Sequence, residues 1–291
     1  MNAVVVRRLA KRLGVVVLTV LAGGLLCATM VRLAPGFDAD ERELDSRLNA
    51  DSVRVIRNQR AGERNVGHFY LAFLKKAAAG DLGESHTLNR PVLSLLRERL
   101  PVTLRLVALG LLFAWTAGFS LAVTVAMARA SAYDWLVTLL VSVCLSLPAA
   151  VLALLIVYWN KPAYLALALA VLPKLYSYSR NLLIENYKRL HILAARAKGL
   201  GPVRILLWHV LPVGAPELLA LAGVSVSVAI GAAIPVEALC GIPGIGQLAW
   251  QAALGRDLPL LVTITVLVTL VTLIANTGAD FATASNHQEA Q

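Results

Sequence analysis

The chain has 291 residues, of which 58% are hydrophobic and only 15% are charged. This apolar fraction exceeds what the core of one soluble domain needs, so the composition predicts a membrane protein. The formal net charge is +10, but the cations flank apolar segments and no basic face is long enough to follow a phosphate backbone, so we expect no nucleic-acid partner.

The first apolar window, Gly14 to Val31, has about the length that crosses a bilayer as a helix. Four cations at positions 7, 8, 11 and 12 precede it, an arrangement that resembles a signal peptide. No convincing small-x-small cleavage site follows the window. We therefore interpret it as a retained anchor whose amino terminus lies in the cytoplasm, where Arg and Lys accumulate.

A polar stretch from about Ala34 to Leu100 follows, and its Arg and Lys nearly balance its Asp and Glu. It predicts a small external element. Its expected parts are helices at Arg47–Gln59 and Gly67–Ala79, a turn at Gly80–Gly83 and a helix from Pro91 to Leu100.

Further apolar windows are continuous instead of alternating, which predicts membrane helices and not the strands of a barrel. These windows are Leu106–Met127, Trp135–Trp159, Leu218–Leu239 and Pro259–Ala275, with a weaker one at Pro162–Ser179. Pro148 and Pro235 are expected to kink or loosen the helices that contain them.

The charge pattern decides whether the weak window spans the membrane. Arg180–Arg204 is a second dense cationic cluster, and an even number of crossings must separate it from the cationic amino terminus. The weak window therefore spans, although it contains Pro173 and Lys174, and Lys174 would snorkel toward its cytoplasmic end. This reasoning predicts an all-α protein with six transmembrane helices and both termini in the cytoplasm. A re-entrant weak segment is the alternative, and it would place Arg180–Arg204 outside.

The basic segment after the weak window has the pattern of a helix–turn–helix bracket. Arg189–Lys198 is expected to be a helix, with Gly199 as its C-cap residue and Pro202 in the first turn of a second helix. The second helix, Val203–Leu211, carries Val203, Leu206, Leu207 and Val210 on one side, and Pro212 is expected to turn the chain back to the membrane. Such a bracket suits docking into a groove of another protein, and a plain interfacial connector is the alternative.

The sequence lacks the common motifs for nucleotide binding, catalysis and metal binding. It contains no GxxxxGK[ST] for nucleotide, no GxSxG, no HExxH and no CxxC, so we expect no cofactor or metal in this chain. Gly241, Gly244 and Gly246 are interpreted as loop-forming glycines. Arg105, Glu217 and Glu237 lie close to predicted helix ends, where snorkelling or capping explains an ionisable residue.

The bracket also carries a resemblance to a known family. Ala194-Ala195-Arg196-Ala197-Lys198-Gly199-Leu200, followed by His209-Val210-Leu211-Pro212, resembles the cytoplasmic "EAA" loop of ABC importer permeases. Other segments are similar to the peptide-importer branch in the same order: Arg32–Gly36, Gly80–Gly83, Pro91-Val92, Glu98–Pro101 with Thr103-Leu104, Glu237, Pro243–Gly246 and Arg256–Pro259. The chain departs from the family pattern at Leu193, in the short Asn160-Lys161 connection and after Asp280.

The resemblance implies the first permease subunit of a dipeptide, oligopeptide or nickel importer in a bacterial inner membrane. Its partners would be a second permease subunit, two cytoplasmic ATPases that bind ATP and Mg²⁺, and an extracytoplasmic solute-binding protein. Ala194, Ala195, Arg196, Ala197, Lys198, Gly199, Leu200, His209 and Pro212 would form the site that couples to the ATPase. The chain itself would not be an enzyme.

The expected organisation has three parts: residues 1–34 with the first membrane helix, the external segment 35–100, and a five-helix permease core at 101–291 with a coupling loop at about 186–212. Two other functions are kept as alternatives. An intramembrane hydrolase would turn over a peptide without partners, and a non-transporting scaffold would assemble with an ATPase but show no substrate-dependent ATP turnover.

Overall fold

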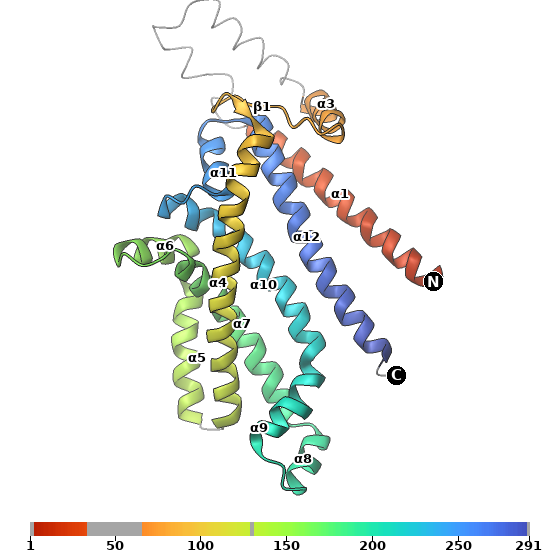
Figure 1. The fold of residues 1–291 in the computed structure, drawn as a ribbon, viewed down its shortest axis with the longest axis vertical. Helices are drawn as coiled ribbons and strands as arrows, with labels where there is room; N and C mark the ends of the chain where they lie inside the picture. Colours follow the sequence, from red (N-terminus) through yellow and green to blue (C-terminus); the bar gives the residue numbers. More distant parts are fainter. Residues whose placement is uncertain (1–2, 34–65, 129–130, 290–291) are drawn as a thin grey trace, which may run out of the picture. The chain divides into compact units, whose positions relative to one another are not determined.

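A computed structural model describes residues 3–33, 66–128 and 131–289, with side chains described for 14–33, 66–128 and 132–279 (Figure 1). These residues are almost entirely helical, which confirms the all-α prediction for the part described. The strands among them form a two-stranded antiparallel hairpin, β1 (Glu84–Ser85) with β2 (Arg90–Pro91), and short turns connect the helices. The helix expected at Arg47–Gln59 lies outside the described residues.

Long apolar helices dominate the described part of the chain. Four are long and apolar enough to cross a bilayer: Gly14–Leu33 of α1 (Ala3–Leu33), α4 (Val92–Ala128), the helix from Pro202 to Cys240, and Leu258–Ala279 of α12 (Leu258–Glu289). A fifth is added if α5 (Ser131–Ser146) and α6 (Ala149–Tyr158) form one broken span. The weak window lies in α7 (Tyr164–Tyr187), which is less apolar than these helices and is not counted among them, so the six-helix topology stays a prediction.

Two of the expected helix boundaries were wrong. The helix at 91–100 and the window at 106–127 are one continuous helix, α4, which passes through Pro101. The window Trp135–Trp159 is instead broken, because α5 and α6 meet at an angle of 99°. The break falls at Leu147 and Pro148, where the Pro lacks the N–H that would continue the helix of α5.

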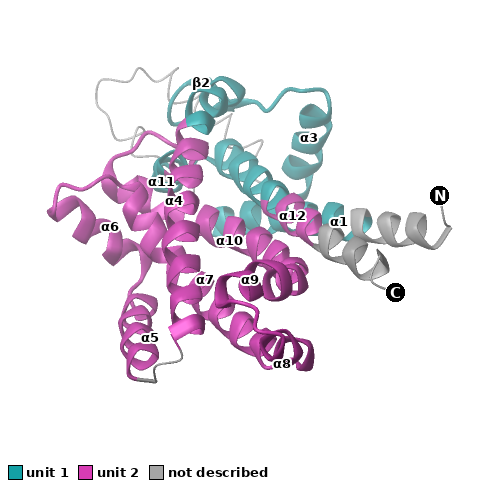
Figure 2. Ribbon diagram, turned by 60° about the horizontal axis from the view of Figure 1, so that its bottom comes forward, with its two compact units in different colours: residues 1–101, 247–271 teal, residues 102–246, 272–291 magenta. Residues whose placement is uncertain are grey.

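The chain forms two compact units, which Figure 2 distinguishes by colour. Unit 1 comprises residues 1–101 and 247–271, and unit 2 comprises residues 102–246 and 272–291. Each unit therefore combines segments that are distant in sequence.

In unit 1, α3 (Val66–Ala78) packs against α1. The Tyr70 hydroxyl donates a hydrogen bond of 2.8 Å to the Leu21 carbonyl, and burial raises the pKa of this phenol, so it stays protonated as a donor. A Cβ on Gly24 would lie 2.6 Å from the Tyr70 oxygen, so the absent side chain permits this close approach. The helix α3 confirms the pattern predicted at 67–79.

The β1–β2 hairpin of unit 1 is held by a buried carboxylate at the start of α12. Asp257 is fully buried and accepts hydrogen bonds from the Ser85 hydroxyl at 2.5 Å and from the Thr87 backbone N–H at 2.9 Å. It also accepts the Leu260 N–H at 3.2 Å, which caps the first turn of α12. Two segments about 170 residues apart are thereby joined, and both lie in or beside motifs of the family resemblance.

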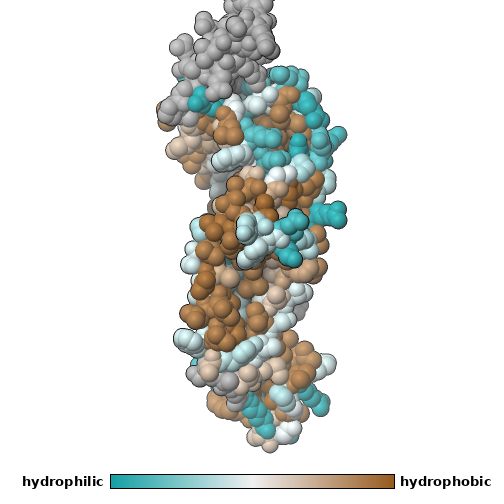
Figure 3. Space-filling view, turned by 90° about the vertical axis from the view of Figure 1, so that its left-hand side faces the viewer, coloured by the Kyte–Doolittle hydropathy of each residue, from teal (hydrophilic) through white to brown (hydrophobic). Residues whose placement is uncertain are grey.

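In unit 2, α10 (Leu211–Cys240) packs along α7 and α6, and α7 also packs against α5. Glycines permit the close approach of α4 to α7: a Cβ on Gly110 would lie 2.4 Å from the Leu167 side chain. The outward faces of α5 and α6 keep many apolar side chains exposed, and the broad apolar patches on this side of the molecule are visible in Figure 3. Such surface is expected where lipid or another membrane subunit is the surrounding medium.

An ion pair joins α5 and α7 within unit 2. The Arg180 guanidinium donates two hydrogen bonds to the Asp134 carboxylate, one of them from Nε to Oδ1 at 2.6 Å. Thr138 lies within hydrogen-bond distance of Asp134 and of the Tyr176 hydroxyl, which extends this polar contact along the two helices. A bidentate pair of this kind fixes the register of the helices that carry it.

Candidate functional site

The segment that connects α7 to α10 is a bracket of two short helices, hereafter the α8–α9 segment (residues 188–210). Its first helix, α8, spans Leu190–Ala197. Gly199 follows with φ +76°, while the Gly199 N–H bonds the Arg196 carbonyl at 2.9 Å and the Leu200 N–H bonds the Ala195 carbonyl at 3.3 Å. These two bonds and the positive φ form a Schellman C-cap, so the predicted role of Gly199 in closing the turn is confirmed.

The second helix of the bracket does not end where the sequence predicted. Pro202 is its first residue, as expected, but α9 (Pro202–Ile205) continues through a π-helical turn, η2 (Leu206–Val210), directly into α10. The expectation that Pro212 turns the chain back was wrong. Pro212 instead lies inside the helix that runs without a break from Pro202 to Cys240, directly after the π-helical turn.

One face of the α8–α9 segment is anchored in the core of unit 2. Ile192 and Ala195 of α8 and Ile205 of α9 are at most 3% exposed. They pack in one cluster with side chains of α4, α5 and α7, among them Val125, Val137 and Tyr176. A displacement of the segment is therefore transmitted to these longer helices, because close-packed side chains do not deform independently.

The opposite face of the segment is exposed and rich in apolar side chains. Leu190 is 83% exposed and Trp208 is 74% exposed, and Leu193, Val203 and Leu207 are all more than half exposed. The sequence had placed Val203 and Leu207 on the same apolar side as Leu206 and Val210, which are buried. That grouping was wrong because it assumed a regular helical period, which the wider π-helical turn at 206–210 shifts.

The nine residues predicted to couple to a partner do not share one environment. The exposed ones are Ala194, Ala197, Lys198, Gly199 and Pro212; Arg196, Leu200 and His209 are partly buried, and Ala195 is buried. No role was predicted for Leu190 or Trp208 from the sequence. Their exposure as large apolar residues was the missing signal, and only the structure shows it.

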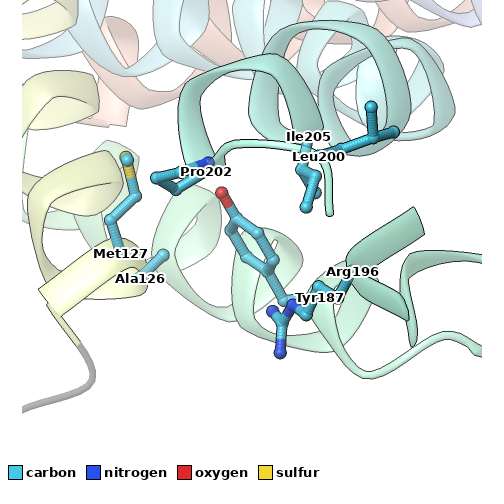
Figure 4. A pocket seen from close by; sticks show the side chains of 7 residues that line it. All are labelled: Ala126, Met127, Tyr187, Arg196, Leu200, Pro202 and Ile205. Carbon is cyan, nitrogen blue, oxygen red and sulfur yellow. The ribbon is translucent and has the colours of Figure 1, made fainter. Parts of the chain in front are cut away.

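A small cavity of about 230 Å³ opens on the inner side of the bracket (Figure 4). It is lined by Ala126, Met127, Tyr187, Arg196, Leu200, Pro202 and Ile205. The Arg196 guanidinium lies 5.8 Å from the centre of the Tyr187 ring, a cation–π distance. This contact ties the last turn of α8 to the end of α7.

A buried carboxylate organises the loop after α10. Glu237 is fully buried and its Oε2 accepts the Gly246 N–H at 2.6 Å, while the Thr103 hydroxyl accepts the Ile245 N–H at 2.8 Å. The two bonds cap the start of α11 (Ile245–Leu254). Capping, one of the two explanations expected for Glu237, is thereby confirmed, and snorkelling is not, because the side chain has no exposed surface. Gly241, at φ +65° just after α10, forms the turn as predicted.

Among the described residues, no group of three His, Cys, Asp or Glu side chains could hold a metal ion. The three cysteines Cys27, Cys144 and Cys240 are free and partly buried. The candidate site is therefore the α8–α9 segment, with one face packed in unit 2 and an exposed apolar face, and not a group of catalytic or metal-binding side chains.

Comparison with known proteins agrees with this description. Residues 114–288 match the family model described as "Binding-protein-dependent transport system inner membrane component". The chain is 30% identical to the oligopeptide transport system permease protein OppB of Escherichia coli over 261 residues, which cover 82% of this chain and 84% of that protein. It is 28% identical to a peptide permease protein of Brucella suis over 294 residues, which cover 91% of this chain and 92% of that protein.

A match over more than half of the chain shows the family. The chain is a multi-pass permease subunit of an ABC importer in a bacterial inner membrane, and it belongs to the binding-protein-dependent transport system inner membrane component family. It is not itself an enzyme, because ATP hydrolysis in such importers takes place on a separate subunit. The alternative of an intramembrane hydrolase is thereby set aside.

Proposed function

We propose that this permease subunit imports peptides, as the first of two permease subunits that form one translocation pathway. Di- and oligopeptides are the favoured class because the named relatives in Escherichia coli and Brucella suis are an oligopeptide and a peptide permease. Nickel complexes and other small solutes are the second candidate class, because the motifs of the sequence also resemble nickel importers.

The α8–α9 segment is proposed as the element that couples transport to an ATPase. The observation that carries this proposal is its two-sided character: Ile192, Ala195 and Ile205 anchor it to the long helices, while Leu190 and Trp208 leave an apolar face uncovered. Desolvation of such a face drives docking into a groove of a partner, and the anchored face passes the movement on.

Two cytoplasmic ATPases that bind ATP and Mg²⁺ would supply the energy, and an extracytoplasmic protein would deliver the solute. For the α8–α9 segment to meet an ATPase, it must face the cytoplasm. That orientation follows if α5 and α7 both cross the bilayer, giving six crossings with both termini inside. The 24 residues of α7 extend about 36 Å as a helix, more than the roughly 30 Å of the hydrocarbon core.

Uptake in a strain that lacks the gene tests this function. We expect loss of growth on di- or tripeptides as the only source of a required amino acid, and recovery with the wild-type gene. Accumulation of radiolabelled peptide and of nickel is measured in the same strains. Unchanged peptide uptake with lost nickel accumulation would overturn the substrate class. Unchanged uptake of both, with an assembled ATPase complex, would favour a non-transporting scaffold.

A further inference from the structure

A second cavity of unit 2, with a volume of about 390 Å³, lies between α7, α10 and the last part of α12. It is lined by Lys174, Ala220, Val224, Ser227, Val228, Asn276 and Ala279. Its volume falls in the range of about 300–1,000 Å³ that is usual for small-molecule sites. The lining is mostly small and apolar, with three polar residues among it.

The polar residues of this cavity form a donor set with one cation. The Ser227 hydroxyl donates to the Asn276 side-chain oxygen at 2.9 Å, which leaves the Asn276 amide nitrogen as a donor. Lys174 adds an ammonium group, and none of the other lining residues is acidic. Cationic and amide donors, with no acidic side chain among the described lining residues, match the chemistry of a carboxylate.

The helix that carries Lys174 is longer than the sequence suggested. The sequence had placed the helix end near Ser179 and Lys174 close to it, but α7 continues to Tyr187. Lys174 is therefore about 15 Å from the start of the helix at Tyr164 and about 20 Å from its end, if each residue rises 1.5 Å. On α12 the same cavity is lined by Asn276 and Ala279, which lie at the end of the apolar span Leu258–Ala279, so the cavity lies toward one end of that span.

A lipid phosphate is also an anion, so the experiment below compares anionic with zwitterionic lipid to separate a lipid headgroup from the carboxylate of a solute. A charged residue inside the membrane is costly without a counter-ion, and such residues commonly mark a substrate pathway. An anionic group that passes through the membrane with the transported solute would provide that counter-ion.

We propose that Lys174, with Asn276 and Ser227, forms a transient binding site for the carboxylate of the transported solute. For a peptide, this group is the carboxyl terminus or an acidic side chain. The inference deepens the proposed function and rests on it, because it requires that α7 spans the membrane and that the solute carries a carboxylate.

The test measures peptide binding to the complete transporter, with all its permease and ATPase subunits, in lipid nanodiscs without the solute-binding protein. The probes are trialanine and its carboxy-terminal amide, which differ only in the proposed ligand group. Wild type should bind the acid at least about tenfold more tightly than the amide, since a hydrogen bond to a charged group is stronger than one to a neutral group. Lys174→Met should abolish this difference, and Lys174→Arg should keep most of it.

Two further variants sharpen the comparison. Asn276→Asp adds a competing carboxylate to the cavity and should also weaken binding of the acid but not of the amide. Lys161→Met removes an exposed cation from the short connection between α6 and α7. It should change neither the binding of the acid nor the binding of the amide. Nanodiscs with zwitterionic lipid alone are compared with nanodiscs that contain anionic phosphatidylglycerol.

Each remaining outcome contradicts the inference. Equal binding of acid and amide by wild type, binding of neither, or a preference for the acid that survives in Lys174→Met would refute a carboxylate site at Lys174. Loss of acid binding in phosphatidylglycerol nanodiscs would assign the cavity to lipid, and release of the second permease subunit by Lys174→Met would assign Lys174 to an intersubunit ion pair. If wild-type cells take up peptide although one of these results is obtained, only the carboxylate site at Lys174 is refuted, and the proposed function in peptide import is retained.

Discussion

Replacing Gly199 with Asp is expected to reduce peptide uptake and co-purification of the ATPase by at least about tenfold, while membrane insertion is retained. Gly199 has φ +76°, a conformation that costs residues with a Cβ about 1–2 kcal/mol. A Cβ there would meet nothing within 4 Å, so the effect cannot come from a clash inside the chain. The larger loss is expected from burial of an unpaired charge where the segment docks.

Gly201 provides the matched control. It is also exposed with nothing within 4 Å of a Cβ, but its φ is −66° and it is the N-cap residue of α9, where Asp is favoured. The α8–α9 segment should therefore stay folded in Gly201→Asp, and most of the ATPase should still co-purify with this variant. Full uptake and full ATPase association by Gly199→Asp would show that the α8–α9 segment is a plain connector.

Replacing Gly246 with Leu is expected to prevent folding of the loop after α10. A Cβ on Gly246 would lie 2.6 Å from the Cα of Ile234, a backbone atom that cannot rotate away, and 3.1 Å from the Ala233 carbonyl oxygen. The added side chain would also displace the Glu237 carboxylate, which accepts the Gly246 N–H. We expect a loss of about 3 kcal/mol or more in the free energy of unfolding, the upper range for overpacking.

Thermal unfolding of the detergent-purified complex, followed by size-exclusion chromatography, measures this loss. Gly231→Ala is the matched control, because Gly231 lies inside α10 with nothing within 4 Å of a Cβ. That substitution should leave the midpoint unchanged or raise it, since Ala is the better helix former. A midpoint for Gly246→Leu equal to that of wild type would show that the close contact with Ile234 does not exist.

The sequence predicted the parts of the fold that depend on local chemistry. Gly199 and Pro202 mark the end of α8 and the start of α9 because positive φ and a missing N–H have strong local preferences. The remaining prolines were predicted less well. Pro148 coincides with the expected bend, which is 99°, but Pro235, for which a kink was also expected, lies inside the continuous helix α10. Further prolines inside continuous helices are Pro101, Pro173 and Pro216. Whether a proline breaks a helix depends on which neighbours satisfy the freed carbonyl groups, and these are tertiary contacts.

The site was predicted only in part for a related reason. Motif resemblance located the bracket, but exposure and burial within it depend on the π-helical turn at 206–210, which no sequence period indicates. The end of the helix that carries Lys174 was misjudged, because the polar second half of α7 suggested a helix end near Ser179. The ion pair of Arg180 with Asp134 of α5 offsets the cost of that polar half, and it became evident only once both helices were placed together.

Site-specific photocrosslinking in intact cells tests the proposed coupling most directly. A photoreactive amino acid at position 208 replaces the exposed Trp208, and one at position 159 replaces Trp159, which is 59% exposed beyond α6. Figure 1 shows α6 well separated from α8 and α9, which lie at the opposite end of α7. We predict a crosslink to the ATPase from position 208 and none from position 159. No ATPase crosslink from position 208 in a transport-active complex, or equal crosslinks from both positions, would show that the α8–α9 segment does not dock on the ATPase.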